Sequence, residues 1–394
     1  MRYKTRFALF FLGMILFQLA ANFAHPVTPT IIQELNLPDY MFGLMLAAMM
    51  FSNFLFSPFW GKINGILSSR RTLLVGCAGY GAAQLIFACA KTQGAILLAR
   101  VLAGIFVGGI FVSFLTYVIN RAKPEDQAKY LTYSATIQAV CGAFGYLVGG
   151  VLGEYSIRAT FLLQSVTLVG TGVLFYLVCL PDQTAAEKLT AGQLLRQSNP
   201  LRAFLDGRQF LKGTLVLLFC LNVLINFANT GFDQVFNYYL KDQLGLTSSY
   251  NGIIKAGVGL ISFVFNMTVC LWIIRKTDTK VSLVALTAFC AASAIGTLVF
   301  PQMGVFVFCS ILVYAGYSVS LPVLQDMVAR RAEPGQKNLV MGFYNATKSL
   351  GSIIGSLMAG FLYSVHNRLP FGVVAAVYSV SIVLAIGYLV RSRK

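Results

Sequence analysis

The sequence predicts an all-α polytopic membrane protein with twelve transmembrane helices in two pseudo-symmetric six-helix bundles. Three observations support this fold class: the composition, the lengths of the apolar stretches and an internal repeat. Of the 394 residues, 57% are hydrophobic and 11% are charged, whereas a soluble globular domain carries about 25% charged residues. A soluble core cannot bury so much apolar surface, so a large part of that surface must face lipid.

Twelve apolar stretches are long enough to cross a bilayer core, which takes about 20 residues of α-helix. The first begins like a signal peptide, but it continues without a cleavage-site pattern into Pro26 and Pro29, so we interpret it as an uncleaved span. Several stretches exceed 25 residues, and we expect those helices to tilt or curve. The twelve lie at residues 6–34, 40–67, 72–90, 95–121, 129–153, 158–180, 211–240, 248–275, 280–300, 303–330, 339–364 and 369–390.

One long polar interval, which begins at Pro181, separates the first six spans from the last six. It divides the chain into an N-terminal six-helix bundle at 1–180, a linker at 181–210 and a C-terminal six-helix bundle at 211–394. All other connections are short, which leaves no room for a soluble catalytic domain.

The net charge of +17 is distributed as in a membrane protein, so we expect no nucleic-acid partner. Of the 30 Lys and Arg residues, 23 lie in the termini, the linker and the loops on the same side, and four lie in loops on the opposite side. An excess of basic residues marks cytoplasmic loops. Both termini and the linker are therefore predicted to be cytoplasmic, in a multi-pass protein of the cell membrane. The remaining three, Arg100, Lys255 and Lys348, lie inside spans.

Two short sequence motifs of the first half of the chain are repeated in the second half. Asn22-Phe23-Ala24-His25 is echoed 204 residues later by Asn226-Phe227-Ala228-Asn229. The glycine pattern around Gly145 and Gly150 is echoed 210 residues later around Gly355 and Gly360. Internal repeats of this kind are typical of transporters built from two related halves around a central site.

Polar residues line one face of the seventh span. Asn222, Asn226, Asn229, Asp233 and Asn237 are spaced by 4, 3, 4 and 4 residues, which places all five on one side of a helix. A polar stripe cannot face lipid, so it either lines a cavity or forms hydrogen bonds to other helices. We favour a cavity, because an isolated carboxylate is an expensive way to join helices.

The first span carries a matching polar set, Gln18, Asn22 and His25. The imidazole of His25 can titrate near neutral pH, and a hydrogen-bonded filler role remains open. Lys348 lies near the middle of the eleventh span beside Asn345. This ammonium group can pair with Asp233 or bind a negative group of a substrate, and the sequence leaves both alternatives open.

Several motifs carry a resemblance to a known family. Arg100 and Gly104 fit an R-x-x-x-G pattern in the fourth span, and Phe232-Asp233 stands in the seventh. The residues 141–150 follow a glycine-rich motif of the fifth span, and Gly61 with Arg70 retains part of a loop motif after the second. On these motifs, the chain resembles the major facilitator superfamily, and within it the twelve-span drug:proton antiporters of bacteria.

The resemblance implies roles for these residues. Asp233 corresponds to a protonation site and Arg100 to an arginine linked to proton transfer, and His25 is the next candidate for proton coupling. The glycines and arginines of the two motifs are implied in conformational change: Gly61, Arg70, Arg71, Gly145, Gly149 and Gly150. The sequence departs from the family at Gly65, where the loop motif has Asp, and at Tyr146, where the fifth-span motif has Pro.

We therefore expect a secondary transporter, a proton-coupled exporter of small amphipathic compounds that works by alternating access. The alternative is an uptake or exchange carrier for an anionic metabolite or lipid-like substrate. An intramembrane enzyme would need paired acids, a Ser/His set or metal-ligand spacing, and the spans provide none, so we expect no catalytic residue, metal or cofactor. The expected partners are a small-molecule substrate, protons and the lipid bilayer, and the protein is expected to be monomeric.

The residues expected to contact substrate share a polar or aromatic side chain in the interior of a span. They are Gln18, Asn22, His25, Phe111, Tyr117, Gln138, Asn222, Asn226, Asn229, Tyr314, Tyr317, Asn345 and Lys348.

The predicted topology can be tested by labelling. A cysteine introduced by Ser198→Cys in the linker is expected to resist a membrane-impermeant thiol reagent in intact cells and to react after the membrane is opened. Background from the eight native cysteines is subtracted with the unsubstituted protein. Labelling from outside at this position would overturn the topology.

Overall fold

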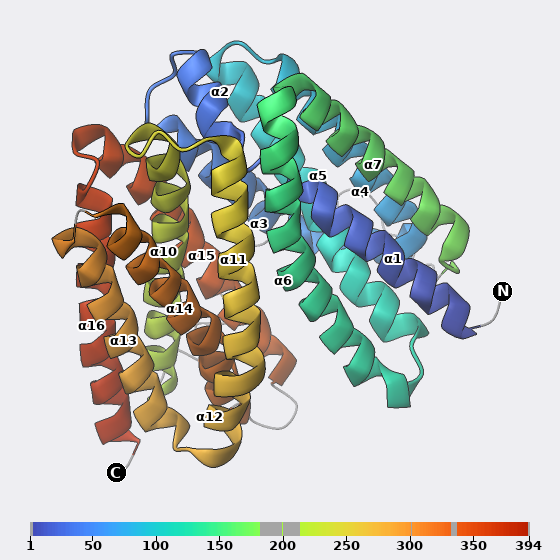
Figure 1. Ribbon diagram of the computed structural model, residues 1–394. Helices are drawn as coiled ribbons and strands as arrows, with labels where there is room; N and C mark the ends of the chain where they lie inside the picture. Colours follow the sequence, from blue (N-terminus) through green and yellow to red (C-terminus); the bar gives the residue numbers. More distant parts are fainter. Residues whose placement is uncertain (1–2, 182–198, 200–212, 301, 332–336, 393–394) are drawn as a thin grey trace. The chain divides into compact units, whose positions relative to one another are not determined.

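Figure 1 shows the computed structural model of the chain, which describes residues 3–181, 199, 213–300, 302–331 and 337–392. Within these ranges every regular element is a helix, so the predicted all-α class is confirmed. Most of the linker predicted at 181–210 lies outside the described residues. The chain forms two compact units, and neither is continuous in sequence.

The first unit comprises residues 1–35, 48–200 and 246–259. Its segment 246–259 belongs there because the Ser249 N–H donates to Glu154 (3.3 Å) and the Ser249 hydroxyl donates to the Gly150 carbonyl (3.4 Å). Its helices are α1 (Tyr3–Ala21), α2 (Thr28–Glu34), most of α3 (Met41–Leu67), α4 (Ser69–Cys89), α5 (Gln93–Arg121), α6 (Pro124–Tyr155), α7 (Ile157–Val178) and the start of α11 (Ser248–Phe265).

The second unit comprises residues 36–47, 201–245 and 260–394. Its segment 36–47 is held by the Tyr238 hydroxyl, which donates to Asp39 (2.7 Å), and by the Ser356 hydroxyl, which donates to the Gly43 carbonyl (2.8 Å). Its helices are α10 (Leu215–Asp242), the end of α11, a π-helical segment (Asn266–Cys270), α12 (Leu271–Lys276), α13 (Thr279–Val299), α14 (Met303–Arg331), α15 (Lys337–Val365) and α16 (Leu369–Arg391). The division at 1–180 and 211–394 stays a prediction.

Eleven helical stretches of the described residues are long and apolar enough to cross a membrane. The predicted span at 248–275 is one of them, formed by α11, the π-helical segment and α12. Helix α15 has 29 residues, but it is not among the eleven. Its first half carries Tyr344, Asn345, Thr347 and Lys348. The polytopic membrane fold is therefore confirmed, whereas the count of twelve is not reached on length and apolarity alone.

The first predicted span, 6–34, is not one continuous helix. Helix α1 ends at Ala21, the chain turns through residues 22–27, and α2 begins at Thr28. Pro26 and Pro29 lack the N–H groups that a continuous helix would use. The Asn22 side chain donates to the Gln18 carbonyl (2.8 Å), so it satisfies a carbonyl at the end of α1 that the broken helix leaves free.

Glycines bring α1 close to α6 and α10 close to α15. A Cβ atom at Gly149 would collide with the backbone of Phe23, and one at Gly355 would collide with the backbone of Phe227. Phe23 and Phe227 are the members of the 204-residue echo. The two helix pairs are therefore built in the same way, as the internal repeat predicts.

The spacing of the glycine echo differs between its two contacts. On α1 and α10, Gly149 corresponds to Gly355, an offset of 206 residues rather than 210. The predicted offset of 210 holds for a second pair of contacts. Gly150 of α6 faces the Ser248 carbonyl, and Gly360 of α15 faces the Tyr40 carbonyl. The two values differ by four residues, which is about one helical turn.

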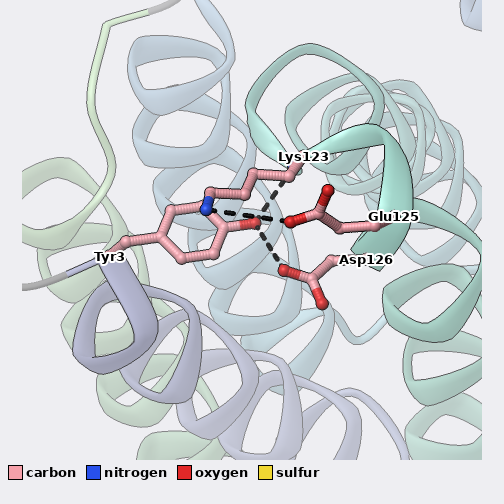
Figure 2. Close-up of polar contacts among 4 residues, drawn as sticks. All are labelled: Tyr3, Lys123, Glu125 and Asp126. Carbon is pink, nitrogen blue, oxygen red and sulfur yellow. Dashed lines mark hydrogen bonds and ion pairs between the residues drawn. The ribbon is translucent and has the colours of Figure 1, made fainter.

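A small polar cluster joins the start of α1 to the start of α6 (Figure 2). The Tyr3 hydroxyl donates to Asp126 (3.2 Å) and accepts from the Lys123 backbone N–H (3.0 Å). Lys123 also pairs with Glu125 at 3.8 Å. This ion pair is exposed, so it adds little to stability. The hydroxyl instead fixes where α1 begins relative to the α5–α6 connection.

A matched pair of glycine substitutions tests the packing of α15. Gly355→Ala is expected to destabilise the protein by about 1–3 kcal/mol, because the added methyl group overpacks the contact with α10. Gly342→Ala on the same helix is the control, since no atom lies within 4 Å of its Cβ position. Thermal unfolding of the purified variants should show a lower Tm for the first only, and equal Tm values would contradict the close approach.

Candidate functional site

Two amides of the predicted polar face are hydrogen-bonded, Asn222 to helix α15 and Asn226 to Asn222 within α10. Asn222 is fully buried, and its amide nitrogen donates to the Tyr344 carbonyl (2.7 Å) and to the Thr347 hydroxyl (2.9 Å). The Asn226 amide donates to the Asn222 carbonyl (2.8 Å) and to the Asn222 side-chain oxygen (2.9 Å). This end of the face therefore forms interhelical hydrogen bonds, the alternative to a cavity.

Two tyrosines of α14 donate to the same face. The Tyr317 hydroxyl donates to the Asn226 side-chain oxygen (3.0 Å), and the Tyr314 hydroxyl donates to the Asp233 carboxylate (2.8 Å). Both tyrosines were expected from their aromatic rings as parts of an apolar wall. Their hydroxyl groups are what connects them to α10. The half-buried Asp233 is thereby held from α14.

Between these two tyrosine contacts, the polar face of α10 makes fewer hydrogen bonds. The side-chain oxygen of Asn229 is buried and has no hydrogen-bond partner in the described protein. One residue further, Thr230 hydrogen-bonds to the Ser352 hydroxyl of α15 (3.0 Å). Sequence reasoning missed Thr230, Thr347 and Ser352 as members of this network.

Lys348 and Asn345 lie on a different face of α15. Their neighbours Tyr344 and Thr347 are buried, whereas Lys348 and Asn345 are exposed. Both alternatives for Lys348, pairing with Asp233 and binding a negative group of a substrate, stay predictions.

The polar residues of the first unit gather where α1 breaks. Asn22 donates to the Gln18 carbonyl at 2.8 Å, the same i to i−4 contact that Asn226 makes to Asn222 at 2.8 Å. The Tyr80 hydroxyl of α4 donates to the Ala21 carbonyl (3.3 Å), and the Thr28 hydroxyl donates to the Ala24 carbonyl (2.7 Å). The Gln18 and Ala21 carbonyls therefore receive side-chain donors at the break, whereas the Ala24 carbonyl also accepts from the Thr28 backbone N–H (3.1 Å).

His25 lies in this break against the ring of Tyr146. The two rings are stacked, with centroids 5.2 Å apart and an interplanar angle of 10°. The ammonium group of Lys255 lies 5.6 Å from the centroid of the same ring. Tyr146 is the residue that replaces the proline of the fifth-span motif, so this departure from the family pattern places an aromatic ring against both His25 and Lys255.

Arg100 is buried, with 5% of its surface exposed. Its guanidinium lies 4.0 Å from the centroid of the Phe87 ring and donates to the Thr28 hydroxyl over a long 3.4 Å. Arg100 therefore stands next to the break in the first span.

The other predicted contact residues of the first unit lie apart from the break. Tyr117 is buried in an aromatic core, with its ring centroid 4.8 Å from that of Phe10. Phe111 is partly buried and packs against Phe17 at 6.0 Å. Gln138 is exposed on α6. Their contact with substrate stays a prediction.

The predicted conformational residues fall into two groups. Gly145, Gly149 and Gly150 pack against backbone atoms of neighbouring helices. In the loop motif, Arg70 lies 5.1 Å from the centroid of the Tyr176 ring, whereas Gly61 and Arg71 are exposed. Their part in conformational change is not tested by the geometry.

Membrane-spanning helices with polar faces at repeated positions in both halves define a membrane carrier. The family model of the Major Facilitator Superfamily matches residues 10–304 and 235–394 of the chain. The chain belongs to this superfamily, and its members are carriers rather than enzymes. It is therefore a multi-pass membrane transporter for small molecules.

The relatives include proteins with established names. The chain is 22% identical to the quinolone resistance protein NorA of Staphylococcus aureus over 391 residues, which cover 97% of this chain and 96% of NorA. It is 20% identical over 363 residues to the multidrug resistance protein 1 of Bacillus subtilis, covering 92% and 89% of the two chains.

Solved structures share the fold. A bacterial homologue of the human lysosomal transporter Spinster superposes with a TM-score of 0.76 at 13% identity, over 99% of this chain and 97% of the other. The human organic anion transporter MFSD10 superposes with a TM-score of 0.69 at 17% identity, over 98% and 100%.

Proposed function

We propose that the protein exports small amphipathic compounds in exchange for protons, by alternating access. The observation that carries this proposal is the Asp233 carboxylate, which lies half-buried on a polar face inside a membrane span and accepts a hydrogen bond from Tyr314 (2.8 Å). Ionisable groups inside a membrane are costly, so their presence favours a functional role. The names of the two relatives, a quinolone resistance protein and a multidrug resistance protein, support export.

The Tyr314 hydroxyl suits a carboxyl group that changes its protonation state. A hydroxyl can donate to a carboxylate, and it can also accept from a protonated carboxylic acid. Tyr314 therefore holds the Asp233 side chain in one place in both states. In the proposed cycle Asp233 takes up a proton when it is open to the outside and releases it when it is open to the cytoplasm, with substrate moving in the opposite direction.

The Asn222–Asn226 network fixes the frame around this carboxyl group. Its hydrogen bonds tie α10 to α15 and, through Tyr317, to α14. An interhelical hydrogen bond in a membrane contributes about 0.6 kcal/mol on average, so several together resist separation of the three helices. Asn229, with its unpartnered buried oxygen, is the amide of this face that is left to bind a polar group of the substrate.

The second candidate function is uptake or exchange of an anionic or lipid-like compound. One observation favours it: the Lys348 side chain is exposed near the middle of α15. Arg100 and Lys255, the other cations inside spans, are both buried beside aromatic rings. Lys348 is thus the cation that can meet the negative group of a substrate.

The orientation belongs to the same proposal. The 23 basic residues on one side and four on the other support a cytoplasmic location for both termini and for the 181–210 linker. The protein would work as a monomer in the cell membrane, with bundles at 1–180 and 211–394 as its two moving halves.

Replacement of the carboxyl group tests proton coupling. Asp233→Asn keeps the size of the side chain and its acceptor oxygen for Tyr314, but it cannot exchange a proton. We expect this variant to bind substrate and to lose transport driven by a pH gradient in proteoliposomes. Asp242→Asn at the end of the same helix is the control and should keep coupled transport. Uphill transport by Asp233→Asn in response to pH alone would refute coupling through this residue and make His25 the next candidate.

Replacement of the exposed lysine tests how substrate charge is selected. Lys348→Ala is expected to weaken binding of anionic compounds about ten- to hundredfold, because a hydrogen bond to a charged group contributes about 1.5–3 kcal/mol. Cationic compounds should be unaffected or bind more tightly. Lys348→Arg, which keeps the charge, should retain the wild-type preference. An unchanged profile of bound compounds in Lys348→Ala would assign the lysine a structural role.

A further inference from the structure

Arg100 is a buried cation of the first unit, with no ion pair to an acid among the residues that the structure describes. It is 5% exposed, its one hydrogen bond within these residues goes to the Thr28 hydroxyl (3.4 Å), and the Tyr80 hydroxyl is a further polar group near it. A guanidinium carries five N–H donors. Its planar face is covered by the Phe87 ring at 4.0 Å. Most of its donors therefore have no acceptor in the described part of the protein.

No carboxylate of the surrounding helices can neutralise this charge. Between Asp39 and Glu125 the sequence contains neither Asp nor Glu, and the stretches 127–153 and 155–181 contain none either. Of the acids of this unit that the structure describes, Glu125, Asp126 and Glu154 lie at the ends of α6, and Glu34 is exposed at the end of α2. Arg100 lies seven residues inside α5, about 10 Å along its axis. The membrane interior of this unit thus has a positive charge and no negative one.

Two buried amides on the adjoining helices are also without partners. Gln84 of α4 is 1% exposed and Gln164 of α7 is 0% exposed, and among the described residues neither side chain makes a hydrogen bond of regular geometry, although the Tyr80 hydroxyl lies close to Gln84. Buried amides without partners are rare, because each unmade hydrogen bond costs about 1–3 kcal/mol. Their amide nitrogens are donors, like the unused groups of Arg100.

These side chains converge from three helices. On α4, Tyr80, Gln84 and Phe87 follow one another at helical spacing, and both Gln84 and Arg100 lie close enough to the Tyr80 hydroxyl to interact with it. On α7, Gln164 lies between two residues that touch α4. Phe161 packs on Phe87 with centroids 5.3 Å apart, and the Ser165 hydroxyl donates to the Gly81 carbonyl (2.9 Å). This antiparallel register places Gln164 opposite Gln84.

We infer that the Arg100 guanidinium, with the side chains of Gln84 and Gln164 beside it, binds a small monovalent inorganic anion, such as chloride. Arg100 supplies the charge, and the amide nitrogens of Gln84 and Gln164 supply further donors. A charge inside a membrane needs a partner, and a bound halide provides it without an acidic side chain. The near-complete burial of these residues excludes a bulky organic anion, and a single guanidinium matches a single negative charge.

Anion-dependent stability tests the inference, and this measurement requires no transported substrate. The purified protein is unfolded thermally in sodium gluconate with increasing replacement by sodium chloride or sodium bromide at constant ionic strength. A ligand that binds the folded state raises Tm in a saturable way. We expect such a rise for the wild type and for Gln93→Leu, an exposed amide at the start of the same α5. In Gln84→Leu and Gln164→Leu the halide-dependent rise should be lost.

A second measurement decides the matter if these variants do not fold. Crystals of the wild-type protein grown in bromide should show an anomalous peak beside the Arg100 guanidinium and the two glutamine amides. Three results would each overturn the inference: no saturable effect of halide on Tm in the wild type, a wild-type response in Gln84→Leu, or bromide crystals without a peak beside Arg100.

Discussion

The exclusion of water from the bilayer core is the constraint on which this structure depends. Every backbone N–H and C=O in that region must find a partner within the protein. Continuous helices satisfy the rule automatically, and each irregular position needs a side chain to do so. Asn22 and Tyr80 serve the break after α1, where they donate to the carbonyls of Gln18 and Ala21. The same polar side chains that make a site possible are thus first used to repair the backbone.

Most of the fold could be predicted from the sequence, because length and apolarity are properties of each helix alone. The exception is the first span, where the sequence predicts one helix at 6–34 and the structure has two with a turn between them. Prolines inside a span do not by themselves decide between a kink and a break. The outcome depends on a donor from another helix, the Tyr80 hydroxyl, and such a tertiary contact has no signature in the local pattern.

The site could be predicted less completely, for a related reason. Helical spacing correctly grouped Asn222, Asn226 and Asp233 on one face, since the helical period is fixed. It could not assign their partners, which depend on how α14 and α15 are placed along their axes against α10. The repeated glycines show how far the axial position of a packed helix can differ from the prediction. Their offset is 206 residues at one contact and 210 at the other, and one helical turn decides which side chains meet.

Helix α14 contains Pro322, which has no N–H to offer the carbonyl four residues earlier, that of Ser318. Asn266, at the start of the π-helical segment (Asn266–Cys270), donates its amide to this carbonyl at 3.1 Å. The residues at positions 322 and 266 therefore depend on each other. Replacing Pro322 alone gives the Ser318 carbonyl two competing donors, and replacing Asn266 alone leaves this carbonyl without its donor. A chain that loses both at once can close α14 into a regular helix, so in divergent sequences these residues should be gained and lost together.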